Sequence, residues 1–239
     1  MPVSGIAVKQ KPLHPGKILM KPGNTYKILL VPLLLFPLAV LGHTVNYALE
    51  KAPVSHVVGF YLKLGIQHII PYGIDHILFV ISLCLLSTRI KTILWQATAF
   101  TVAHSVTLAL SMKGVLVVPG AVVEPIIALS IMFVAIENML LSELKPWRIA
   151  IVFLFGLIHG MGFASSLNEI GLPRGKFYTS ILSFNAGVEM GQVIVIAGVF
   201  TLVIIPFGKR RWYRKWVVYP ASILIASIAA YWVVMRAFF

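Results

Sequence analysis

The feature that most constrains this chain is a succession of apolar runs, most of them about as long as a bilayer crossing. The 239 residues are 59% hydrophobic and only 11% charged, whereas soluble domains carry about 25% charged residues. A helix needs about 20 apolar residues to cross the hydrocarbon core of a membrane. Such runs lie over 27–42, 67–87, 92–112, 122–141, 148–167, 178–205 and 216–236. The sequence therefore predicts an all-α, polytopic transmembrane helix bundle, with six core spans after an N-terminal one.

The first apolar run has a second interpretation. A basic leader followed by "ILLVPLLLFPLAVLG" is also the pattern of a signal peptide, so 27–42 is either the first span or a cleaved signal. We expect 1–26 to be a basic cytoplasmic segment and 43–66 to be an external loop with an interfacial helix over 53–66. The six-helix membrane domain then occupies 67–236.

The net charge of +13 resembles that of a nucleic-acid-binding protein, but the positions of the lysines and arginines favour a role in membrane topology. They gather in alternate connections, around 9–27, 89–91, 145–148 and 209–215. Because short cytoplasmic loops are rich in Lys and Arg, we expect the N-terminus inside and the C-terminus outside a bacterial inner (plasma) membrane. The expected partners are the lipid bilayer and a metal ion, with no nucleic acid, and a homo-oligomer is left open. The single cysteine, Cys84, excludes an intramolecular disulfide.

Polar and ionisable side chains recur at one expected depth in four of the spans. On the topology above they lie about seven to eleven residues below the outer surface, in a layer centred ~12 Å deep at 1.5 Å per helical residue. An ionisable group at that depth is costly unless it is paired or bound, so the set predicts a site. Its members are Asp75, His76, His104, His159, Asn185 and Glu189. His68 is expected on the same helical face as Asp75 and His76, with Tyr72 between them.

These residue types point to metal chemistry. Neutral imidazole and carboxylate together suit Ni²⁺, Co²⁺, Zn²⁺ or Fe²⁺. Protons compete with metal for imidazole, so binding is expected to weaken below the ordinary imidazole pKa of about 6.5. The expected supporting groups are Tyr72, Ser105, Asn185 and Gln192, and the expected path residues are Glu124 and Glu137. Plain helix–helix hydrogen bonding is the alternative for Ser105 and Gln192, and an interfacial position is the alternative for Glu124.

Five motifs then occur in the order of a known family. They are "GIQHIIPYGIDHILFV", "FTVAHSVTLAL", "VEPIIALSI", "FGLIHGMGFA" and "FNAGVEMGQ". Over roughly residues 60–200 the chain resembles the HupE/UreJ membrane proteins. The resemblance implies a secondary nickel or cobalt permease. It also implies that the histidine–aspartate–histidine motif of the family, and its later histidine and glutamate, correspond here to His68, Asp75, His76, His159 and Glu189.

The leading hypothesis is uptake of a divalent transition metal, with nickel or cobalt first and zinc next. The predicted metal ligands are His68, Asp75, His76, His104, His159 and Glu189. One alternative is an intramembrane enzyme of the zinc type, because three histidines and a carboxylate can hold Zn²⁺ with a position open for water. Another is a metal-binding membrane assembly factor or sensor. Transport is favoured because Glu124 and Glu137 extend the polar layer in both directions.

Overall fold

The computed structural model describes residues 46–239, and the expected first span over 27–42 lies outside the described residues together with the basic segment before it. The described part of the chain forms helices joined by turns, without any strand between 46 and 239. Most of the helices are long. A short 3-10 turn precedes α8, a π-helical turn follows it, and another π-helical turn precedes α10. Their order is α2 (Tyr47–Lys51), α3 (Val54–Ile69), α4 (Ile74–Leu85), α5 (Ile90–Met112), α6 (Gly120–Leu140), α7 (Arg148–Ile170), η2 (Arg174–Lys176), α8 (Phe177–Val199), η3 (Phe200–Ile204), α9 (Ile205–Phe207), η4 (Arg214–Val218) and α10 (Tyr219–Phe238).

Five helical stretches in the described part are long and apolar enough to cross a membrane. They cover Ile90–Met112, Gly120–Leu140, Arg148–Ile170, Arg174–Phe207 and Arg214–Phe238. The pair α3 and α4 makes a sixth if the two are counted as one broken crossing. The predicted all-α transmembrane helix bundle is therefore confirmed, and the chain is a membrane protein.

The predicted span over 67–87 is not one continuous helix. Helix α3 runs to Ile69, and α4 begins at Ile74 after a bend of 68°. The helix expected over 53–66 is thus the first part of α3, which continues further along the chain. Only the second half of the predicted span is a helix of its own, and that helix is short.

Pro71 explains the break between α3 and α4. Proline has no N–H to donate, and it disfavours helical backbone at the residue before it. Ile70 accordingly has φ −122° and ψ 117°. The N–H of Gly73 donates to the carbonyl oxygen of Ile69 at 3.1 Å, and α4 starts at the next residue. His68, Asp75 and His76 were predicted to share one helical face. That prediction is wrong, because the break separates His68 from the other two.

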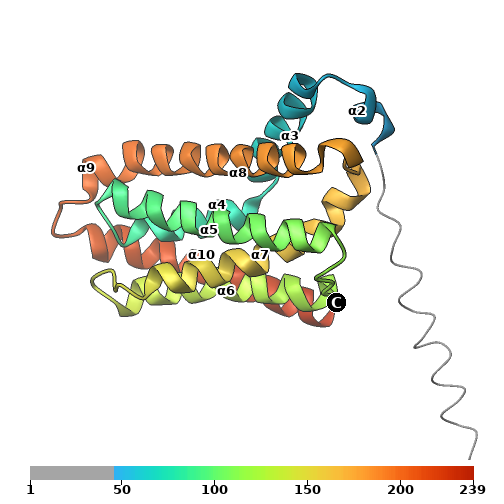
Figure 1. The fold of residues 1–239 in the computed structure, drawn as a ribbon. Coiled ribbons are helices and arrows are strands. Elements are labelled where there is room, and N and C mark those ends of the chain that lie inside the picture. Colours follow the sequence, from blue (N-terminus) through green and yellow to red (C-terminus); the bar gives the residue numbers. More distant parts are fainter. Residues whose placement is uncertain (1–45) are drawn as a thin grey trace, which may run out of the picture. The chain divides into compact units, whose positions relative to one another are not determined.

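The long helices pack in close pairs, α5 with α7, α3 with α8 and α6 with α10. Figure 1 shows α5 beside α7 and α8, with α3 tilted away from the direction of α8. Glycines permit the closest approaches. A Cβ atom on Gly160 would overlap the carbonyl oxygen of His104, and one on Gly65 would overlap that of Phe184. Such small residues let membrane helices approach closely, so they fix the spacing of the helices that carry the polar residues.

The polar residues lie between two clusters of buried apolar side chains. On α5 the first cluster ends at Phe100 and the second begins at Leu108, with His104 between them. The same order recurs on α7, around His159. Close packing on both sides holds these side chains in fixed rotamers, which positions the site described next.

Candidate metal centre

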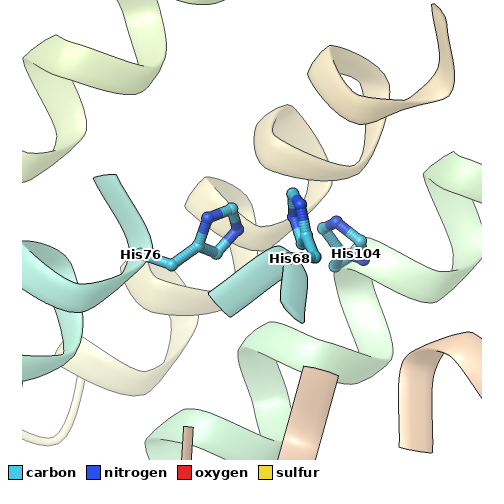
Figure 2. Close-up of side chains that lie close together, drawn as sticks. All are labelled: His68, His76 and His104. Atoms are coloured by element: carbon cyan, nitrogen blue, oxygen red, sulfur yellow. The ribbon is translucent and has the colours of Figure 1, made fainter. Parts of the chain in front are cut away.

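Three histidines from three helices meet beside the α3–α4 break, as Figure 2 shows. His68 lies in the last turn of α3, His76 in the first turn of α4, and His104 on α5. One ring nitrogen of each lies within 4.8 Å of those of the other two. The ring centroids of His68 and His76 are 4.6 Å apart. The break thus turns the chain so that these two rings meet edge to face across it.

His159 of α7 adds a fourth imidazole to this group. Its ring centroid lies 5.1 Å from that of His76, and the side chain is buried. In all four rings the Nε2 atom is buried and has no hydrogen-bond partner within residues 46–239. Buried polar atoms are nearly always paired, because an unpaired one costs free energy. Four such atoms together therefore indicate a site for a ligand. We call His68, His76, His104 and His159 the histidine group.

Two of these rings are oriented through their other nitrogen. Nδ1 of His159 lies 2.8 Å from the carbonyl oxygen of Phe155, which can only accept, so this nitrogen carries the proton. Nδ1 of His104 lies 3.0 Å from Oδ1 of Asn185, whose amide nitrogen donates to the carbonyl oxygen of Ile181. A neutral imidazole protonated on Nδ1 has its lone pair on Nε2. Both rings therefore present the tautomer that binds a metal through Nε2.

Aromatic side chains enclose the group. The ring of His68 lies 3.8 Å from that of Phe163 and 5.6 Å from that of Phe184, measured between centroids. Phe100 lies 4.9 Å from His159 in the same measure. These walls limit the access of water and restrict the rotation of the imidazoles. These phenylalanines were not predicted from the sequence, because phenylalanine in an apolar span carries no separate signal.

A cavity of about 490 Å³ leads to the histidine group. Its lining residues include His68, His76 and His159. Tyr72 and Glu124 also line it, and both are exposed. The cavity therefore connects the imidazoles with the surface of the described fold. Tyr72, expected to lie between histidines on one helical face, belongs instead to the turn at the mouth.

Asp75 lines the same cavity but is not part of the histidine group. Its Oδ2 and Oδ1 atoms accept hydrogen bonds from Nη1 and Nη2 of Arg236 at 2.8 and 3.0 Å. Nη1 of Arg236 also lies 3.5 Å from the carbonyl oxygen of Glu124. Arg236 was not among the predicted site residues. A carboxylate and an arginine were both expected near the same end of two spans, and this could have suggested the pair.

Glu189 also has a partner outside the histidine group. The Thr98 hydroxyl donates to its Oε1 at 2.6 Å, while Oε2 is buried without a hydrogen-bond partner in the described part of the chain. Nearby on α5, Thr101 donates to Oε1 of Gln192 at 3.1 Å, and Ser105 donates to the carbonyl oxygen of Thr101 at 2.6 Å. The bonds of Thr98 and Thr101 join α5 to α8. A lone threonine in an apolar span gives no warning of such a role, so Thr98 was missed.

Glu137 lies in a separate buried network. Its Oε2 is 3.3 Å from Nε of Arg148, and the two side chains are 5% and 2% exposed. Nη2 of Arg148 donates to Oδ1 of Asn138 at 3.1 Å, and the amide nitrogen of Asn138 donates to the carbonyl oxygen of Ser82 at 2.7 Å. This network joins α6, α7 and α4. Arg148 was predicted only as a cation of a connecting segment.

Comparison with known families gave one finding. The model of the family described as HupE / UreJ protein matches residues 44–236, which include the whole histidine group and both acids of the cavity. The comparisons gave no match to a curated protein or to a solved structure.

Proposed function

The chain belongs to the HupE/UreJ family, and on this premise we propose that it takes up a divalent transition metal through the histidine group. The family is associated with nickel and cobalt transport, so nickel or cobalt is the first candidate and zinc the next. The observation that carries the proposal is the meeting of ring nitrogens of His68, His76 and His104 within 4.8 Å of one another, with the His159 ring beside that of His76, at a cavity open to the surface.

Three of the imidazoles are the proposed capture ligands, His68, His76 and His104. Nitrogen ligands about 2.1 Å from one metal lie about 3.0–3.4 Å from one another. The ring nitrogens lie within 4.8 Å of one another, so small ring movements of about 1 Å bring them to that geometry. His159 is the proposed fourth ligand, because its Nε2 is also buried and unpartnered among the described residues.

The carboxylates are proposed to act before and after capture. Asp75 and Glu124 line the cavity and attract cations toward it, and Asp75 is also paired with Arg236. On the proposed topology, with the C-terminus outside a bacterial inner membrane, this cavity opens outward. Glu189 keeps one carboxylate oxygen unpartnered among residues 46–239 and is the candidate for a later ligand. We do not place Glu137 on the path, because its charge is opposed by Arg148.

The test is metal flux into liposomes that contain the purified full chain and enclose a metal-sensitive dye. We expect saturable uptake of Ni²⁺ or Co²⁺ that is lost in His76→Ala. The matched control is His56→Ala, which removes an exposed histidine far along α3 from the break. The control should transport like the wild type.

Two results would count against transport. Transport would be rejected if liposomes that contain the wild-type chain were no more permeable to these metals than liposomes without protein. Zinc that binds tightly to the histidine group and never crosses would instead indicate an enzyme or a storage protein.

A further inference from the structure

A second polar cavity, of about 460 Å³, lies where α5 and α7 begin. Three cationic residues line it: Lys91, Lys145 and Arg148. No carboxylate is among its lining residues in the part of the chain that the structure describes. The carboxylate that faces this set is Glu137, which reaches Arg148 from α6. Three cations against one carboxylate leave the cavity positively charged, so it suits an anion and not a metal ion.

Arg148 forms the buried wall of this cavity. Its side chain is 2% exposed, Nε lies 3.3 Å from Oε2 of Glu137 in an ion pair, and Nη2 donates to Oδ1 of Asn138. Nη1 is buried and has no hydrogen-bond partner within residues 46–239. An arginine retains the charge on its guanidinium and donates readily to phosphate oxygens. An unpartnered, buried guanidinium nitrogen at a basic cavity is thus a donor in need of an anionic acceptor.

The remaining walls suit the boundary between lipid and water. Lys91 and Lys145 are exposed, and Trp95 and Ile149 are 59% and 42% exposed beside them. Tryptophan is enriched at the headgroup level of membranes. Gln96 adds a buried Oε1 atom that is also unpartnered in the described chain, and it can accept a hydrogen bond from a hydroxyl group.

We propose that this cavity binds the phosphate of an anionic, hydroxyl-bearing phospholipid headgroup. The phosphate lies among Lys91, Lys145 and Nη1 of Arg148, while the acyl chains follow Trp95 and Ile149 into the bilayer. Basic pockets between membrane helices are known to bind such headgroups. The proposal goes beyond metal transport and does not depend on it.

Native mass spectrometry of the full chain tests this, after purification in detergent with equal amounts of phosphatidylglycerol and phosphatidylcholine. We expect the wild type to retain phosphatidylglycerol preferentially. Lys91→Gln/Lys145→Gln should lower that preference about tenfold or more, because each cation near an anionic headgroup contributes to binding. The matched control is Lys209→Gln/Arg210→Gln, two exposed cations outside the cavity. It should retain the lipid as the wild type does, and Arg148 is left intact because its ion pair is part of the core.

A second probe, inorganic phosphate, distinguishes the source of the anion. Phosphate could stabilise the delipidated chain against heat, and this effect could be lost only in Lys91→Gln/Lys145→Gln. If the wild type then shows no preference for phosphatidylglycerol, the result would support the same site with a free phosphate as its ligand. Equal loss of phosphatidylglycerol in both double variants would mean general attraction to a basic surface and would overturn the proposal. A wild type that prefers neither probe would overturn it as well.

Discussion

The histidine group beside the α3–α4 break contrasts with the ion pair between Glu137 and Arg148. The first collects four imidazoles of the same chemistry, each with a buried Nε2 that lacks a partner within residues 46–239. The second joins opposite charges at 3.3 Å and ties the arginine to Asn138. In this arrangement the four Nε2 atoms form no hydrogen bond with one another, whereas the opposite charges of Glu137 and Arg148 attract each other. The difference indicates that the ion pair holds helices together, while the histidine group requires a cation from outside.

The largest effect on stability is expected at the ion pair. Glu137→Ala leaves Arg148 as a buried, uncompensated charge, and it should lower the free energy of unfolding by about 3–5 kcal/mol. Glu137→Leu/Arg148→Met removes both charges and should recover most of that loss. Denaturant unfolding in detergent measures both. The contrast fails if Glu137→Ala is no less stable than Glu143→Ala, which removes an exposed carboxylate.

The largest effect on metal binding is expected at the histidine group. His76→Ala should weaken binding of Ni²⁺ or Co²⁺ by more than about a hundredfold, since even groups that only orient a ligand are worth ~10–100-fold. The unfolding free energy should fall as well, because the buried ring packs against Phe100 and its removal leaves a cavity, so the affinities are compared between folded samples. Titration calorimetry measures the affinity, with His56→Ala as control. Normal affinity in His76→Ala would remove this residue from the site.

A smaller loss is expected from Asn185→Ala, which removes the acceptor that orients His104. The metal affinity should fall about tenfold, because the ring loses its fixed tautomer while the ligand itself remains. Gln192→Ala is the matched control, since it removes an α5–α8 hydrogen bond to Thr101 and leaves His104 its partner. Equal losses in the two variants would mean that the effect comes from helix packing alone.

The smallest effect is expected from Asp75→Asn. The pair with Arg236 is partly exposed, so its loss should cost no more than about 1 kcal/mol of stability. Metal affinity should change by only a few-fold, while uptake at low metal concentration slows because the cavity attracts cations less. Stopped-flow uptake and calorimetry separate the two. A loss of affinity as large as that of His76→Ala would make Asp75 a metal ligand.

Much of the bundle could be predicted, because few structures other than transmembrane helices accommodate apolar runs of bilayer length. Equal depth also placed His76, His104 and His159 at one level, and the structure brings these three together. The break at Pro71 was missed because the apolar run continues through it. "PYG" is a turn signal by its composition, and it was outweighed by the length and hydropathy of the run.

Partners far apart in the sequence could not be predicted in the same way. Asp75 and Glu137 were expected to serve the metal, yet each faces an arginine from another helix, Arg236 and Arg148. Which face of one helix meets which face of another depends on close packing, for example at Gly160 against His104. The helical period predicts the depth of a residue in the membrane and its face of the helix, but it does not predict which residue of another helix that face contacts.

X-ray absorption spectroscopy of the purified, nickel-loaded chain tests the central claim most directly, because it counts the imidazoles around the metal. The account predicts at least three imidazole nitrogens at about 2.0–2.1 Å, and fewer in His76→Ala. A shell made of oxygen atoms alone, the same in wild type and variant, would contradict it.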